Sequence, residues 1–83
     1  MLYTIEFLPE AERSLARLSP DVRKRVMKKI ERLRNDLAGD VKRLSDFEPE
    51  WRLRVGDWRV LFDLEGQSIV IWRVVHRSAA YDV

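Results

Sequence analysis

The sequence predicts an α+β fold, in which an antiparallel helical hairpin packs on one face of a twisted, mainly antiparallel four-stranded sheet. Three stretches predict it. Residues 51–64, WRLRVGDWRVLFDL, alternate apolar and other side chains on both sides of Gly56-Asp57, the pattern of two strands joined by a tight turn. Residues 10–37 carry apolar side chains at spacings of three and four, as amphipathic helices do. Residues 68–75, SIVIWRVV, are almost all β-branched or aromatic, which is typical of a buried strand.

The length and composition indicate one small domain, which we place at residues 1–83. Hydrophobic residues make up 46% of the chain, enough for one compact core. With no cysteine and one histidine, the chain has no disulfide, thiol nucleophile or His/Cys metal cage. It has no glycine-rich phosphate loop, so we expect no cofactor and no metal. We find no signal peptide and no membrane-spanning run, so we expect a cytoplasmic protein that does not enter the membrane.

The first half of the chain predicts one strand and two helices. Residues 2–7 are rich in β-formers and are expected to form a strand that a proline ends. A helix follows over residues 10–18. Ser19 and Pro20 supply the N-cap and the first position of a second helix over residues 20–37. The apolar stripe of this helix consists of Val22, Val26, Ile30, Leu33 and Leu37.

The second half predicts a loop and three strands in the order β-α-α-β-β-β. Residues 41–50 are expected to form a mixed loop, with a short extended piece at residues 42–44 left open. The turn at Gly56-Asp57 is expected to be type II′ because glycine comes first. The first strand must join the sheet out of sequence order, and we place it beside the last strand. The two-residue turn sets the register of the hairpin, with Val55 opposite Trp58, Leu53 opposite Val60 and Trp51 opposite Phe62.

Basic residues are concentrated on the second helix, although the net charge is only +2. Seven Lys or Arg residues lie between positions 23 and 34, against one acid, Glu31. Such a helix attracts a polyanion or an acidic protein. Lys24, Arg25 and Lys28 are our candidates for this contact on the second helix. After position 43 the chain has arginine but no lysine, and arginine is the side chain suited to bidentate phosphate contact.

The hairpin gathers arginines on the face opposite its apolar residues. Arg54 is expected to face Arg59 across the two strands, with Arg52 one step along. Like charges directly opposite each other destabilise a sheet, so their convergence is typical of a site that binds an anion. The alternative is that basic residues on an exposed hairpin deter edge-to-edge pairing. Three arginines on one face favour the anion site.

Further candidates lie on the last strand and just after it. Arg73 and Arg77 would help to stabilise the extra charge of a phosphate in its transition state. His76 is a candidate acid or base near neutral pH, and Tyr81 would stack on a base or transfer a proton. Structural roles are the alternatives: Arg73 would extend to a sheet edge, His76 would form hydrogen bonds at a strand end, and Tyr81 would pack in the core.

Several of these motifs together resemble the RelE/ParE toxin superfamily. They are YTIEF near the start, A-x-x-x-L in the first helix, the basic second helix, W-R-L-R-V-G-D-W-R-V-L-F in the hairpin and V-x-H-R-x-x-x-Y at the end. The resemblance covers essentially the whole chain in order. It implies the toxin of a type II toxin–antitoxin pair, and its RelE branch implies a ribosome-dependent endoribonuclease, an mRNA interferase that cuts messenger RNA in the decoding site. The implied reaction is metal-independent attack of a 2′-hydroxyl on its own phosphodiester, which leaves a 2′,3′-cyclic phosphate and a 5′-hydroxyl.

The resemblance also implies catalytic residues. The family's two basic residues of the first hairpin strand fall on Arg52 and Arg54, its arginine after the turn on Arg59, its C-terminal arginine on Arg77 and its tyrosine on Tyr81. Arg54 and Arg59 would hold the scissile phosphate. Arg77 would stabilise developing charge or protonate the leaving oxygen, and Tyr81 would orient the nucleotide.

The chain departs from the best-known RelE-type members at the first two of these positions, where they carry lysine. Lysine loses a proton more easily than arginine, so Arg54 is a poor replacement for a lysine base. Tyr81 or His76 would then take the proton. We expect Arg73 and His76 to contact RNA together with the three positions named on the second helix.

The resemblance implies partners as well. They are a cognate acidic antitoxin that covers the arginine face or displaces the tail after Val75, the ribosome with its mRNA, and operator DNA only through the antitoxin complex. Two other functions remain open. A ParE-like toxin shares the fold but inhibits DNA gyrase by binding, and a non-catalytic module would use the basic helix to bind an acidic partner or nucleic acid. The hairpin motif combined with the terminal H-R-x-x-x-Y favours the interferase.

Overall fold

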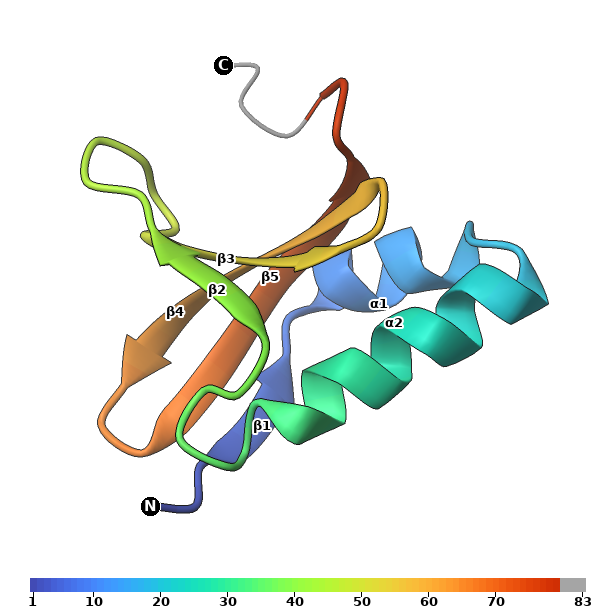
Figure 1. Cartoon of the computed structure of the whole chain (residues 1–83). Helices are drawn as coiled ribbons and strands as arrows, with labels where there is room; N and C mark the ends of the chain where they lie inside the picture. The colour runs from blue at the N-terminus through green and yellow to red at the C-terminus, as the bar shows by residue number, and fades with distance from the viewer. Residues whose placement is uncertain (80–83) are drawn as a thin grey trace.

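A single twisted sheet of five strands carries two helices on one face (Figure 1). The computed structural model describes residues 1–79. In chain order the elements are β1 (Thr4–Phe7), α1 (Pro9–Ala16), α2 (Pro20–Arg32), β2 (Asp40–Arg43), β3 (Trp51–Val55), β4 (Trp58–Glu65) and β5 (Ser68–His76). The predicted α+β class, a helical hairpin on a mainly antiparallel sheet, is confirmed.

The strand order is β1-β5-β4-β3-β2. β1 runs parallel to β5, which confirms that the first strand joins the last, and the other pairs are antiparallel. The predicted count of four strands was wrong, because β2 adds a fifth strand beside β3. Three of its four residues are exposed, so this edge strand has almost no apolar pattern to predict it from. The extended piece left open at residues 42–44 overlaps it.

Both helices end earlier than predicted. α1 ends at Ala16, and α2 ends at Arg32 rather than at position 37. Asp36 and Leu37 have left-handed φ angles of 54° and 58°, and the Leu37 N–H donates to the Leu33 carbonyl at 3.0 Å. Leu37 still packs against the core after this reversal. The apolar spacing therefore continues beyond the helix, which explains the overestimate.

The guanidinium group of Arg23 holds the connection between the helices. Its Nε donates to the Leu15 carbonyl at 2.9 Å, and its Nη2 donates to the carbonyls of Leu18 at 2.9 Å and Ala16 at 3.2 Å. These carbonyls lie at the C-terminal end of α1, where the helix dipole favours a positive charge. Arg23 is therefore a structural residue, although it is one of the seven basic residues counted on this stretch of sequence.

The helices and one sheet face enclose a single core within residues 1–79. Its largest fully buried side chains come from both layers: Val26, Ile30, Leu33, Leu53, Val60, Phe62, Ile69 and Ile71. No helix in the described part of the chain is both long and apolar enough to span a membrane.

A β-bulge in β5 decides which sheet face Arg73 occupies. Leu61 pairs with Arg73 but Phe62 pairs with Ile71, so Trp72 is an extra residue in the strand. Strict alternation after the buried Ile71 would point position 73 into the core. The bulge gives the core position to Val74 instead. Arg73 therefore lies on the face that the helices do not cover, here called the open face, with Arg52, Arg54, Arg59 and Leu61.

Candidate functional site

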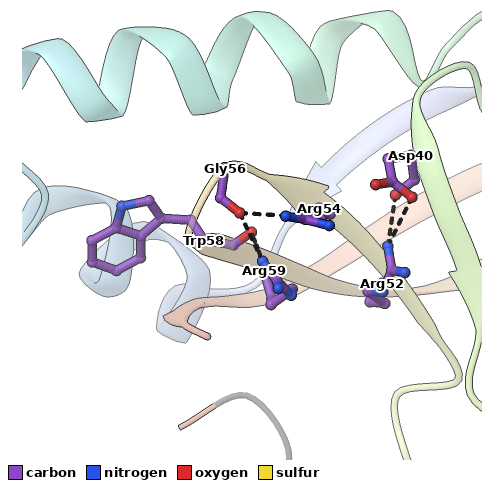
Figure 2. A network of polar contacts seen from close by, with 6 residues as sticks. All are labelled: Asp40, Arg52, Arg54, Gly56, Trp58 and Arg59. Atoms are coloured by element: carbon purple, nitrogen blue, oxygen red, sulfur yellow. Dashed lines mark hydrogen bonds and ion pairs between the residues drawn. The ribbon is translucent and has the colours of Figure 1, made fainter. Parts of the chain in front are cut away.

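Two arginines meet at the tight turn between β3 and β4. Arg54 is paired with Arg59 across the strands, as the hairpin register predicted. Gly56 has a φ of 60° while Asp57 has no positive φ, which is the sign pattern of the expected type II′ turn. Arg54 Nε donates to the Gly56 carbonyl at 3.4 Å, and Arg59 Nη1 donates to the same oxygen at 3.0 Å (Figure 2).

Neither of these guanidinium groups forms an ion pair with a carboxylate of residues 1–79. Arg59 Nη1 has one further acceptor, the Trp58 carbonyl at 3.1 Å. Backbone carbonyls orient a guanidinium group but do not cancel its charge. The turn therefore presents two like charges side by side, an arrangement that an anion would stabilise.

Arg52 has a different environment on the same strand. Its Nη1 donates to the Asp40 carbonyl at 2.9 Å and lies 3.3 Å from the Asp40 carboxylate, and its side chain is only 14% exposed. This ion pair ties β2 to β3 (Figure 2). The charge of Arg52 is thus largely balanced within the fold, unlike the charges of Arg54 and Arg59.

Arg77 reaches the same turn from the end of β5. Its backbone N–H donates to the Asp57 carbonyl at 2.7 Å, and its Nε lies 3.8 Å from Asp57 Oδ1. Both side chains are well exposed, so this ion pair is weak. Arg77 therefore stands beside the turn that carries Arg54 and Arg59. Tyr81, the remaining predicted catalytic residue, lies outside the described residues.

His76 lies on the other sheet face. It pairs with Trp58, whose indole packs against the core, and the two rings meet edge to face with centroids 5.3 Å apart. The Nδ1 atom lies 3.0 Å from Ser78 Oγ and 3.3 Å from the Ser78 backbone nitrogen, so the ring is held at the end of the strand. The predicted RNA contact at His76 is therefore separated from Arg54 and Arg59 by the sheet.

The basic side of α2 adjoins the arginine turn. Lys24, Arg25 and Lys28 are all exposed, as their predicted role requires. Arg25 and Lys29 line a cleft of about 550 Å³ together with Arg54 and the turn. Sequence reasoning missed Lys29, although its place one helical turn after Arg25 was a usable signal. Asp40 and Asp57 also line this cleft, so its wall joins three basic side chains of the turn and α2 to two acidic ones.

The chemistry that this arrangement offers is phosphate binding and stabilisation of negative charge. Residues 1–79 contain no group of three or more His, Cys, Asp or Glu side chains placed to bind a metal ion. The arginines supply hydrogen-bond donors and positive charge, and neither Arg54 nor Arg59 is suited to remove a proton. Arg73, also on the open face, has a buried Nε without a hydrogen-bond partner.

Comparisons with known proteins agree with this reading of the fold. A sequence family described as "ParE toxin of type II toxin-antitoxin system, parDE" matches residues 5–81. The curated protein "Toxin RelE3" of Methanocaldococcus jannaschii is 35% identical over 66 residues, covering 74% of this chain and 75% of that protein.

Solved structures give the same result. The chain superposes with a TM-score of 0.76 on a chain of the RelB–RelE antitoxin–toxin complex from Methanococcus jannaschii, at 28% identity over 93% of this chain and 95% of the other. For the toxin–antitoxin complex RelBE2 of Mycobacterium tuberculosis the TM-score is 0.79, at 28% identity over 93% and 100% of the two chains. The chain therefore belongs to the RelE/ParE superfamily and is a toxin of the type II toxin–antitoxin class.

Proposed function

We propose that this toxin is a ribosome-dependent, metal-independent endoribonuclease that cleaves mRNA in the decoding site. The observation that supports it most directly is the group of Arg54, Arg59 and Arg77 around one turn, where Arg54 and Arg59 share a carbonyl and neither pairs with a carboxylate of the described residues. Guanidinium groups in this arrangement bind a phosphodiester and stabilise the charge it gains on nucleophilic attack.

In the proposed reaction the 2′-hydroxyl of the RNA loses its proton and forms a bond to the adjacent phosphorus. The bond from phosphorus to the 5′-oxygen of the next nucleotide breaks, and that oxygen takes up a proton. The products are a 2′,3′-cyclic phosphate and a 5′-hydroxyl. Arg54 and Arg59 hold the non-bridging oxygens, and Arg77 stabilises the leaving oxygen or protonates it.

The proton of the 2′-hydroxyl requires a base other than Arg54 or Arg59. His76 and Tyr81 were the two candidates. Because His76 lies on the opposite sheet face from these arginines, we assign the base to Tyr81. Arg52 contributes by positioning β2 and β3 through Asp40 rather than by binding the scissile phosphate.

We further propose that a cognate acidic antitoxin inhibits the toxin by covering the arginine turn. The relatives solved as RelB–RelE complexes support an antitoxin partner, and the uncompensated charges of Arg54 and Arg59 support its acidic character. Operator DNA would be contacted only through this complex. Since the substrate is mRNA on ribosomes, the site of action is the cytoplasm.

Inhibition of DNA gyrase is the second candidate, and it is favoured by the ParE description of the matching family. A ParE-like toxin would act by binding and would cut no RNA. The third candidate, a non-catalytic basic module, would use Lys24, Arg25 and Lys28 alone. Both candidates leave the arginine group at the β3–β4 turn without a catalytic role.

The test is cleavage of a defined mRNA by purified protein, with and without programmed ribosomes, with analysis of the product ends. We expect cuts in the decoding-site codon, only with ribosomes, carrying 2′,3′-cyclic phosphate ends. Arg43, an exposed residue of β2 that forms an ion pair with Glu50, provides a control. The variant Arg43→Ala removes one positive charge and should cleave normally. Inhibition of gyrase supercoiling without any RNA cleavage would transfer the assignment to the ParE-like function.

A further inference from the structure

Three arginines meet in a second cleft, at the edge of the sheet beside α1. The cleft has a volume of about 150 Å³. It is lined by Arg13 of α1, by Arg17, the C-cap residue directly after α1, and by Arg73 of β5. Arg13 and Arg17 lie one helical turn apart and are exposed. None of the three takes part in an ion pair within residues 1–79, and the only carboxylate on the cleft wall is that of Glu10.

The fold builds this cleft where α1 replaces a strand. β1 pairs with β5 only as far as Phe7↔Ile71. Beyond that point α1 covers the edge, and Ser14 Oγ accepts a hydrogen bond from the Val74 N–H at 2.9 Å. The same hydroxyl donates to the Ala11 carbonyl at 3.0 Å, so it is committed to the fold. These bonds fix α1 against β5 and keep Arg13 and Arg17 close to Arg73.

Arg73 supplies an independent indication that the cleft binds an anion. Its Nε is buried and has no hydrogen-bond partner. A buried donor without a partner is unfavourable, and a charged one especially so. The β-bulge at Trp72 brings this side chain out of the core. It shares the cleft wall with Arg13 and Arg17, so the cleft concentrates positive charge that an anion would neutralise.

The size and position of the cleft indicate a phosphate of a polymer. Ligand pockets for drug-sized molecules begin at about 300 Å³, so this cleft admits a small anionic group and no complete nucleotide. Val75 lines the cleft and is paired with Arg59 on the neighbouring strand, and adjacent strands lie about 4.8 Å apart. An RNA backbone held at Arg59 therefore passes close to the cleft.

We propose that the cleft of Arg13, Arg17 and Arg73 is a second phosphate-binding site, which holds the RNA backbone beside the scissile phosphate. The proposal rests on the proposed function and adds a substrate subsite to it. The oxygens of a tetrahedral phosphate can accept hydrogen bonds from guanidinium groups on two sides of the cleft. A planar carboxylate of an antitoxin would instead form a bidentate contact with one guanidinium group. The site positions RNA and takes no part in the chemical step.

The first experiment measures binding without cleavage. A short RNA with a 2′-deoxynucleotide at the cleavage position is titrated with the wild type, Arg13→Ala, Arg17→Ala and the control Arg43→Ala on the opposite sheet edge. We expect each cleft variant to bind about 3- to 10-fold more weakly at low salt, with a salt slope smaller by about 0.7. Arg43→Ala should keep the wild-type slope. Thermal unfolding of each variant checks that it is folded.

Nuclear magnetic resonance then locates the contact. The Nε–H signal of Arg73 in the wild-type protein is followed during titration with inorganic phosphate. We expect a saturable shift that is lost in Arg17→Ala. Absence of a shift, or the same shift in Arg17→Ala, would overturn the proposal.

Steady-state cleavage on programmed ribosomes separates this proposal from the proposed function. Arg13→Ala and Arg17→Ala should raise KM and leave kcat unchanged. If the wild type cleaves mRNA and the cleft variants have the same KM as Arg43→Ala, the second phosphate site is wrong, but the proposed endoribonuclease function stands. If the wild type does not cleave mRNA, yet the cleft variants still bind RNA more weakly than the wild type, the endoribonuclease function is wrong and the phosphate site stands. A loss of antitoxin affinity with unchanged RNA affinity would assign the cleft to the antitoxin and overturn the proposal.

Discussion

Arg23, at the start of α2, and Arg59, at the start of β4, both donate hydrogen bonds to backbone carbonyls, but their surroundings differ. Arg23 meets three carbonyls at the C-terminal end of α1, where the helix dipole compensates its charge. Arg59 meets two carbonyls at a tight turn and shares one of them with the facing Arg54. Hydrogen bonds to carbonyls therefore do not distinguish a structural arginine from one that binds an anion. The distinguishing property is whether the surroundings compensate the charge of the guanidinium group.

The largest effect is expected for Arg59→Ala. Loss of one donor to the developing charge should slow cleavage about 10²- to 10³-fold on programmed ribosomes. The melting temperature should stay the same or rise, because the change removes a like charge facing Arg54. Single-turnover cleavage and thermal unfolding measure the two effects. Full cleavage by this variant would remove Arg59 from the site.

Arg23→Ala should lower the stability of the protein and leave cleavage unchanged, the opposite of Arg59→Ala. It leaves the carbonyls of Leu15, Ala16 and Leu18 without the guanidinium donor, so we expect a loss of about 2 kcal/mol in the free energy of unfolding. Denaturant unfolding measures it, with the exposed Arg25→Ala as a control for helix α2. Cleavage per folded molecule should be unchanged. An unaltered unfolding midpoint would mean that solvent satisfies these carbonyls equally well.

A comparison of alanine variants at two glycines distinguishes the effect of backbone strain on stability from the effect of arginine placement on cleavage. Gly56 and Gly66 have φ angles of 60° and 61°, and a Cβ at either position would meet no atom within 4 Å. Alanine at each should therefore cost a similar amount, about 1 kcal/mol, through the left-handed backbone. Only Gly56→Ala should also reduce cleavage, because relief of the strained backbone there would displace the Gly56 carbonyl that orients both Arg54 and Arg59. Equal cleavage by the two variants would contradict the role given to this carbonyl.

The smallest effect is expected for the Arg52–Asp40 pair. A double-mutant cycle with Arg52→Ala and Asp40→Ala should give a coupling of about 0.5 to 1 kcal/mol in stability. Cleavage by Arg52→Ala should fall less than in Arg59→Ala, since Arg52 positions strands. Equal losses of cleavage in the two variants would place Arg52 at the phosphate.

Much of the fold could be predicted because its signals are local. The alternation on both sides of Gly56-Asp57 predicted the hairpin and its register, and the register placed Arg54 opposite Arg59. The strand β2 was anticipated only as an open extended piece at residues 42–44, because an exposed edge strand carries no apolar period. The end of α2 was misplaced because Leu37 keeps the apolar spacing after the helix has ended.

The α+β class, the tight turn and the pair of facing arginines follow from local patterns in the chain, since they depend on residues a few positions apart. What each arginine contacts became known only from the folded arrangement. Arg52 pairs with Asp40 from another strand, and Arg73 leaves the core through a bulge. Arg73 then shares a cleft with Arg13 of α1 and with Arg17 at the end of that helix, both far away in the chain. The reason is physical: the surroundings of a charge depend on distances in space, and the spacing of residues along a chain does not contain them.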